Sequence, residues 1–102
     1  MTATTLTSKQ RAHLRALAHS LKPVLQIGAE GVSEPFLRAL TEALHTRELL
    51  KVKVLESAPE DPRCSADAIA ARLPGVGVAQ TIGRTIVLYR HFPEDPRIQL
   101  PR

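Results

Sequence analysis

The stretch Gln26-Ile27-Gly28-Ala29-Glu30-Gly31-Val32-Ser33 places two glycines three positions apart, between an extended apolar run and a residue that can cap a helix. Glycine has no Cβ, so a Gly-x-x-Gly loop can bring its backbone close to a ligand and adopt dihedral angles closed to other residues. A helix that begins after such a loop offers free N–H groups and the positive end of its dipole, which together attract a phosphate. The stretch predicts a strand, a loop and a helix, and it leaves two interpretations open: an anion cradle or a plain turn.

A first helix is predicted upstream of this stretch. Thr7 followed by Gln10 matches a capping box, which opens a helix running to about His19. Its expected buried stripe, at helical spacing, consists of Leu14, Leu17, Ala18 and Leu21. Three basic side chains spaced by four then form a row on another face, namely Arg11, Arg15 and His19. This row is either part of a binding surface or an ordinary solvated face.

The second helix follows the glycine loop directly. Ser33 is its expected N-cap, Pro35 falls in its first turn, and Val32 is placed to pack on Leu37. Its predicted buried stripe consists of Phe36, Leu40, Ala43 and Leu44. Residues 50–55 then alternate apolar and charged side chains, which predicts a strand with one buried face. Lys51 and Lys53 are therefore expected to point away from the core together.

The remaining chain predicts a loop, a third helix and a hairpin. Residues 58–63, with two prolines and two acids, are typical of a long exposed loop, and a short third helix through Ala66 and Ile69 follows it. Two β-rich runs, 76–82 and 85–89, surround Gly83-Arg84, where glycine in first place suits a type II′ turn. That turn would hold Arg84 out at the hairpin tip.

The order helix, strand, helix, strand, helix, strand, strand indicates an α/β fold. Helical crossovers make parallel strand pairs and a tight hairpin makes an antiparallel one, so a four-stranded mixed sheet is expected. Each helix must bury a stripe, and the simplest packing places the three helices mainly on one face. We assign residues 1–92 to one domain and residues 93–102, with three prolines, to an extended C-terminal tail.

Composition narrows the class of protein. The 102 residues, 43% of them hydrophobic, suffice for one small core. Only three residues are aromatic, which argues against binding of single strands by stacking on exposed rings. The single cysteine, Cys64, excludes an internal disulfide and a Cys-rich zinc site, and we expect no cofactor and no metal. The chain shows neither a membrane span nor a signal peptide, so a cytosolic location is expected.

The charges are unevenly distributed along the chain. The formal net charge is +4, and four basic residues precede the first acid, Glu30: Lys9, Arg11, Arg15 and Lys22. The acids gather in the middle of the chain and arginines return in its later part. A one-sided basic surface favours nucleic acid, because neutralised phosphates release counterions. A solvated charged face would give the same pattern.

Taken together, four segments resemble the bacterial YhbY family, the single-domain members of the CRM-domain group. They are residues 21–24 (Leu-Lys-Pro-Val), 27–33 (Ile-Gly-Ala-Glu-Gly-Val-Ser), 50–54 (Leu-Lys-Val-Lys-Val) and 82–90 (Ile-Gly-Arg-Thr-Ile-Val-Leu-Tyr-Arg). The resemblance extends from about Leu6 to the C-terminus. It implies a fold similar to the C-terminal domain of bacterial translation initiation factor three, with no enzymatic activity.

The resemblance also implies RNA binding, in association with precursors of the large ribosomal subunit. The RNA-binding loop would be Gly28, Ala29, Glu30 and Gly31, with basic neighbours Lys22, Lys51, Lys53, Arg84 and Arg90. The row containing Arg11 and Arg15 could extend this surface. One departure concerns the loop itself, where related loops have polar or basic residues between the glycines and this chain has an acid. An ionised Glu30 repels phosphate unless it points away or a cation such as Arg38 offsets it.

Three functions are therefore compared. The first is a non-enzymatic protein, expected to be monomeric, that binds ribosomal RNA and the precursor large subunit, with no membrane or small-molecule partner. The second is a module that contacts ribosomal proteins instead of RNA, suggested by Glu30 and the proline-rich tail. The third is an enzyme, which the sequence disfavours. His13 and His19 diverge on one helix, Cys64 suits packing, and Asp61 and Asp67 suit helix starts.

Overall fold

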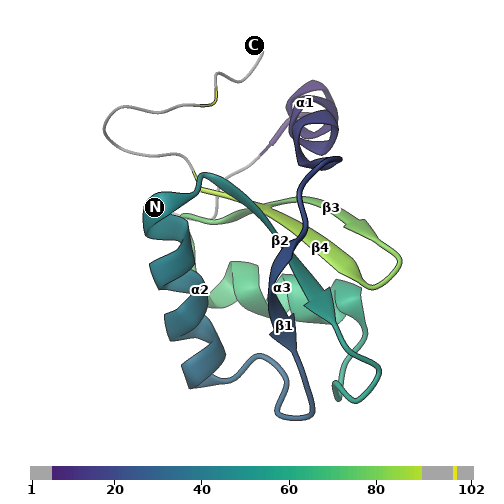
Figure 1. The fold of residues 1–102 in the computed structure, drawn as a ribbon, viewed down its shortest axis with the longest axis vertical. Coiled ribbons are helices and arrows are strands. Elements are labelled where there is room, and N and C mark those ends of the chain that lie inside the picture. Colours follow the sequence, from purple (N-terminus) through teal and green to yellow (C-terminus); the bar gives the residue numbers. More distant parts are fainter. Residues whose placement is uncertain (1–5, 91–97, 99–102) are drawn as a thin grey trace.

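The computed structural model describes residues 6–90 and Ile98, and its elements follow the predicted order (Figure 1). The helices are α1 (Ser8–Ala18), α2 (Glu34–Thr46) and α3 (Pro62–Arg72). The strands are β1 (Pro23–Ile27), β2 (Leu49–Val54), β3 (Gly77–Ile82) and β4 (Thr85–Tyr89). The prediction of a four-stranded mixed sheet with three helices is confirmed. The predicted tail, residues 93–102, lies outside the described residues except for Ile98.

The four strands are ordered β1-β2-β4-β3 across the sheet. β1 runs parallel to β2, because α2 connects them by a crossover, and β4 is antiparallel to both of its neighbours. Ile27 lies beside Val54, so β1 and β2 end at the same end of the sheet. The β1–α2 and β2–α3 connections therefore meet there, at the bottom of Figure 1.

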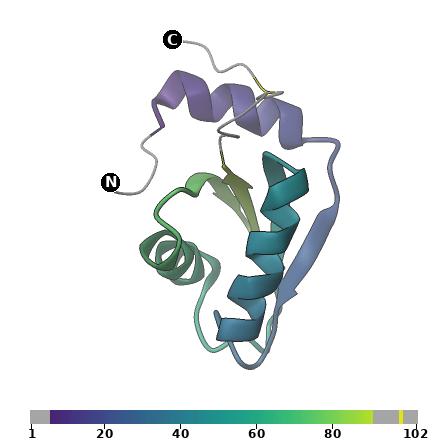
Figure 2. The ribbon, with the colours of Figure 1, turned by 90° about the vertical axis from the view of Figure 1, so that its left-hand side faces the viewer.

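The larger hydrophobic core lies between the sheet and the two helices α2 and α3, which cover the same face (Figure 2). The sheet contributes alternate residues of β2 and β4 to this core, including Val52, Val54, Ile86 and Leu88. The stripe predicted for α2 is confirmed, with Phe36, Leu40 and Leu44 buried. The alternation of buried residues along β2 and β4 follows from the two-residue period of a strand, whose successive side chains point to opposite faces.

The first helix packs on the opposite face, which corrects the prediction that the helices share one side. Leu14 and Ala18 of α1 form a smaller core with the intervening strand residues, among them Leu49, Val87 and Tyr89. Strand β4 is apolar at successive positions, from Ile86 to Tyr89, so both of its faces must be buried. The side chain of Tyr89 is buried in this smaller core on an interior strand, not at the sheet edge.

The buried stripe of α1 is narrower than predicted. Both ends of its capping box are formed, since Thr7 accepts from the amide of Gln10 and the Gln10 side chain accepts from the amide of Thr7. Leu17 and Leu21, however, are exposed, contrary to the prediction. They line a recess with Leu49 and Ile98, whose amide donates to Glu48 Oε1 at 2.9 Å. The helix crosses one end of the sheet, so only a narrow part of its surface meets a strand.

Helix α3 begins earlier than predicted. Asp61 is its N-cap and accepts from the amide of Cys64 at 2.7 Å, and Pro62 occupies the first turn, where a missing N–H is harmless. Residues 62 and 63 therefore belong to a helix and not to the predicted loop. Asp61 is confirmed as a helix-start residue, whereas Asp67 lies inside α3.

The hairpin turn is confirmed, but one of its side chains is not where the sequence placed it. Gly83 has a φ of +54°, the left-handed value that mirror-image hairpin turns require at this position. Arg84 does not extend from the tip. Its Nε donates to the carbonyl of Val54 at 2.8 Å and its Nη2 to the carbonyl of Leu55 at 2.7 Å. The guanidinium thus satisfies carbonyls where β2 ends.

Among residues 6–90 and Ile98, no helix has both the length and the apolar character needed to cross a bilayer.

Candidate nucleic-acid interface

The glycine loop is a tight turn held by its own backbone. The amide of Gly31 donates to the carbonyl of Gly28 at 2.9 Å, and the amide of Ser33 donates to the carbonyl of Gly31 at 3.0 Å. Gly31 has a φ of +69°, which favours glycine, whereas Gly28 does not have a positive φ. A plain turn is therefore sufficient to explain the glycine at position 31. It does not explain the glycine at position 28.

Few amides of this turn remain for a ligand. The amides of Gly31 and Ser33 are used within the turn, the amide of Phe36 donates to Ser33 Oγ, and Pro35 has no N–H. Within the described chain, the amides of Ala29, Glu30 and Glu34 make no hydrogen bond, and all three residues are exposed. A phosphate at this loop would therefore meet two N–H groups of the turn and one N–H group of the helix start, rather than the full set predicted for a helix start.

The surroundings of the turn are acidic. A Cβ added at Gly31 would lie 3.0 Å from Pro59 Cγ, so the turn packs against residues 55–61 that connect β2 to α3. That connection carries three exposed acids, Glu56, Glu60 and Asp61, and the turn adds Glu30. Two cations lie at this end: Arg84, whose Nη2 donates to the carbonyl of Leu55, and Arg63, whose charge helps to lower the pKa of Asp61. Arg72 is paired with Glu34 of α2. We call residues 28–31 together with residues 55–61 the acidic end.

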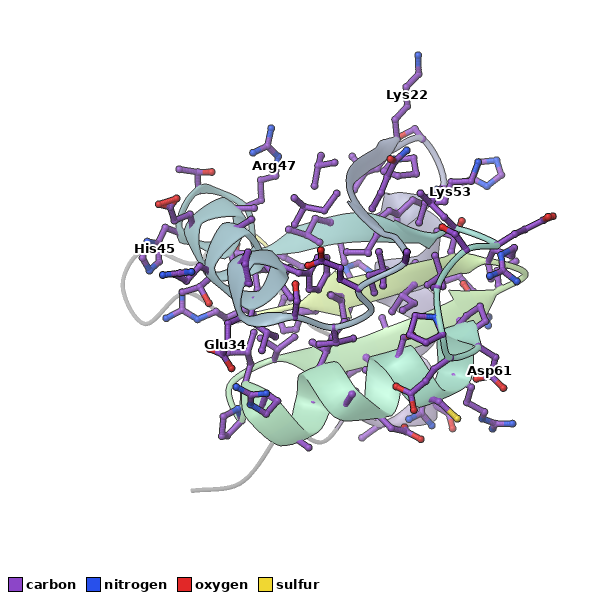
Figure 3. All side chains as sticks on the ribbon, turned by 90° about the horizontal axis from the view of Figure 1, so that it is seen from below. Lys22, Glu34, His45, Arg47, Lys53 and Asp61 are labelled. Atoms are coloured by element: carbon purple, nitrogen blue, oxygen red, sulfur yellow. The ribbon has the colours of Figure 1, made fainter. Side chains whose placement is uncertain are left out.

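The opposite charge gathers on the side of the sheet where α1 packs. Neither α1 nor any of the four strands contains an acidic residue. Strand register places Gln26, Lys53, Thr85 and Ile82 in one row across the four strands. We call this row, with Lys51, Lys22 and the exposed side of α1, the basic face. In Figure 3, Lys22 and Lys53 lie on one side of the molecule, and Glu34 and Asp61 lie on the other.

The two lysines of β2 differ in exposure and in whether the side-chain ammonium group is hydrogen-bonded. They share a face, as predicted, because Lys51 lies beside Val87 and Lys53 beside Thr85. Lys51 is half-buried and its Nζ donates to the carbonyl of Leu21 at 3.0 Å, which ties the α1–β1 connection to the sheet. Lys53 is exposed and is therefore the lysine of this strand best placed for a phosphate. Lys22 is exposed next to Pro23, which pairs with Lys51.

The predicted basic residues do not all gather at one place. Arg15 lies on the basic face beside Ile82, whereas Arg11 lines a recess at the β3 edge with Arg63 and Asp67. Arg84 is at the acidic end, with its guanidinium bound to carbonyls. Arg90 lies at the other end of the sheet and lines a recess between α2 and the connection from α3 to β3. Arg38 lies between α2 and α3, with Glu34, and not beside the loop.

Two residues at these surfaces were not predicted. Arg63 was assigned to the loop of residues 58–63, because its two prolines and two acids are typical of a loop, yet it lies in the first turn of α3. Ile82 was treated as an ordinary strand residue, yet it is exposed beside Arg15. The alternation of β3, combined with the hairpin register, was the available signal that places Ile82 on the same face as Lys53.

The titratable groups of the described chain do not form a reactive cluster. The carboxylate of Asp61 accepts a hydrogen bond from the thiol of the exposed Cys64 and raises the pKa of that thiol. The Cys64 thiol therefore stays protonated and is a weak nucleophile. Burial, followed by the charge of Glu48, raises the pKa of Tyr89. No three His, Cys, Asp or Glu side chains among residues 6–90 and Ile98 are grouped to hold a metal ion.

Comparison with known proteins places this geometry in a family. The chain is 43% identical over 96 residues to "Probable RNA-binding protein YqeI" of Bacillus subtilis, with 94% of this chain and 99% of that protein covered. It is 42% identical over 99 residues to an "RNA-binding protein" of Haemophilus influenzae, with 97% of this chain and 98% of that protein covered. The solution structure of the hypothetical protein SAV1595 from Staphylococcus aureus matches with a TM-score of 0.81 at 37% identity, covering 95% of this chain and all of that one (100%).

The family assignment agrees with the resemblance carried by the sequence motifs. The model of the CRS1 / YhbY (CRM) domain matches residues 6–90, which include every helix and strand described above. The protein belongs to the CRS1/YhbY (CRM) domain family.

Proposed function

We propose that this protein is a non-enzymatic RNA-binding factor of large-ribosomal-subunit assembly, acting as a monomer in the cytosol. Its relatives from Bacillus subtilis and Haemophilus influenzae are named as RNA-binding proteins. The observation that carries the proposal is the charge separation between the basic face and the acidic end. A surface of α1 and four strands without a single acid attracts a polyanion, and RNA is the polyanion that the names of the relatives indicate.

In this proposal the RNA backbone lies along the basic face and reaches the glycine loop at its edge. Lys22, Lys53 and Arg15 neutralise phosphates, and Lys51 holds the α1–β1 connection in place while adding charge. The loop contributes the amides of Ala29 and Glu30, and Gly28 allows a close approach of the backbone. Arg11 extends the surface toward the β3 edge. Arg84 and Arg90 contribute to the general positive field rather than to this contact.

The proposal is tested by the salt dependence of affinity for ribosomal RNA. The logarithm of the association constant should fall linearly with the logarithm of salt concentration, and Lys53→Ala should reduce the slope by about one unit. Arg38→Ala is the matched control, since Arg38 is an exposed arginine of α2, the helix that covers the other face of the sheet. Salt-independent affinity, or an equal slope for the wild type and Lys53→Ala, would remove the basic face from the mechanism.

A second candidate is contact with ribosomal proteins, which the exposed apolar side chains near the α1–β1 connection favour. Leu17, Leu21 and Val24 are all exposed within eight residues of sequence. Crosslinking to naked ribosomal RNA and to intact precursor particles separates the candidates. Crosslinks that form only in particles, and only to protein, would support this second function.

A further inference from the structure

An open depression on the basic face lies between α1 and the tip of the β3–β4 hairpin. It has a volume of about 660 Å³ and is lined by Ala12, Arg15, Ala16 and His19 of α1 and by Ile82 of β3. Ala12 and Ala16 are four residues apart, as are Arg15 and His19, so small and basic side chains form two adjacent rows on the helix. The small row leaves space above Ile82.

Ile82 is the most exposed large hydrophobic residue of the described chain, at 53%. A single exposed apolar residue is common, and the surroundings set this one apart. Arg15 and His19 lie on one side of it, and the cross-strand row leads through Thr85 to Lys53 on the other. An occupant that contacts Ile82 therefore needs an apolar surface flanked by negative charge.

We infer that this depression, the Ile82 notch, holds one unpaired nucleobase of the bound RNA, an inference that rests on the proposed RNA-binding function. The face of the base lies against the Ile82 side chain and against the planes of His19 or Arg15, both of which can stack on bases. The phosphates on either side of that base meet Arg15 and Lys53. The few aromatic residues of the chain do not prevent this contact, because the notch combines an aliphatic surface with an imidazole and a guanidinium.

A nucleotide fits the notch better than a peptide does. Every base of a nucleic acid has two faces that can stack and a phosphate on each side along the strand, and the notch offers an apolar surface with basic groups on each side. A peptide would need acids placed on both sides of an apolar side chain. Paired bases of an RNA helix present no free face, so the notch takes a base from a loop, bulge or single strand.

The test compares two RNA ligands of equal charge, a single-stranded hexanucleotide and a hexamer of abasic ribose phosphates. Wild-type protein should bind the base-bearing ligand about tenfold more tightly, as expected for one stacked base. Ile82→Ala should reduce this preference to near unity while leaving affinity for the abasic ligand unchanged. Val24→Ala is the matched control, because Val24 is a 42% exposed strand residue outside the notch, and it should keep the preference.

The outcomes separate this inference from the proposed function. If the wild type binds both ligands equally, or Ile82→Ala keeps the preference, the notch is not a base site although RNA binding stands. If neither ligand nor ribosomal RNA binds in a salt-dependent way, the proposed function fails. A peptide alternating glutamate and leucine that binds more tightly than the hexanucleotide, and loses affinity in Ile82→Ala, would assign the notch to a protein partner instead. Thermal unfolding of each variant verifies that it folds.

Discussion

The acidic end consists of two connections that follow β1 and β2, and the basic face consists of the strands themselves with α1, yet the two regions offer a phosphate opposite surroundings. The acidic end has the glycine pair and two unused amides, but four acids lie within or beside the turn. The basic face has no glycine motif, but its helix and strands contain no acid. The comparison teaches that a Gly-x-x-Gly turn sets the path of the backbone, while the surrounding charges decide whether an anion is attracted.

The strongest test of this contrast reverses charge on the basic face. Lys53→Glu combined with Arg15→Glu removes two phosphate contacts and should lower affinity for ribosomal RNA by about a hundredfold at low salt. Titration of labelled RNA with each protein measures the change. Arg38→Glu, a reversal on α2 at the other face of the sheet, should have a small effect by comparison. If the double variant loses no more affinity per reversed charge than the control does, net charge alone governs affinity and the contrast between the two regions is broken.

A second test separates the backbone role of the glycines from their role toward a ligand. Gly31→Ala should destabilise the protein by about 1–2 kcal/mol, because an alanine at a left-handed φ is strained. Its Cβ would also crowd Pro59. Urea unfolding measures this loss.

Gly28→Ala is the matched substitution, since its Cβ would lie at an ordinary 3.8 Å from Leu55 Cδ1. We expect it to be neutral or to stabilise the protein by about 0.4 kcal/mol or more. Lower RNA affinity in this stable variant would show that the backbone at Gly28 approaches the RNA. Equal destabilisation by the two substitutions would contradict the different roles assigned to them.

A third test asks whether RNA reaches the acidic end at all. Glu30→Lys removes a repulsive charge and adds an attractive one beside the free amides, so RNA affinity should rise about tenfold at low salt. Glu42→Lys makes the same change on the exposed surface of α2 and should leave affinity nearly unchanged. An affinity that is equal in both variants would confine the RNA to the basic face.

The smallest expected effect concerns pH. The amide of Cys64, which donates to the carboxylate, holds the pKa of Asp61 below its usual range. The stabilisation that the Asp61 carboxylate gives to the folded protein is therefore complete above the ordinary aspartate pKa of about 4. It is lost as the pH falls through the lower pKa that Asp61 has in the folded state. Asp61→Asn keeps a capping side chain but does not titrate. The difference in Tm between the wild type and this variant should shrink below about pH 4, and a constant difference would refute the assignment.

The sequence predicted local structure well, because the signals for it are local. The capping box at Thr7, the Ser33 cap and the glycine of the hairpin turn each act within a few residues, and each is confirmed. The side of the sheet on which α1 packs was predicted wrongly. That choice depends on strand residues some 70 positions away, Val87 and Tyr89, whose burial on the second face is a property of the assembled sheet.

The candidate site was predicted less completely than the fold. Counting basic residues could not show that the guanidinium of Arg84 is bound to the carbonyls of Val54 and Leu55. Nor could it show that Arg90 lies at the far end of the sheet, because that depends on strand order and length. Lys51 and Lys53 were predicted to share a face because the period of a strand alone decides it.

The division of the hydrophobic interior into two unequal cores has a consequence for motion. α1 is anchored by the smaller core alone, so it can open as a unit while α2, α3 and the sheet keep their own core. RNA that contacts both Arg15 on the helix and Lys53 on the sheet would hold α1 against the sheet. We expect hydrogen exchange of the α1 amides to slow when RNA is bound, with little change in α2.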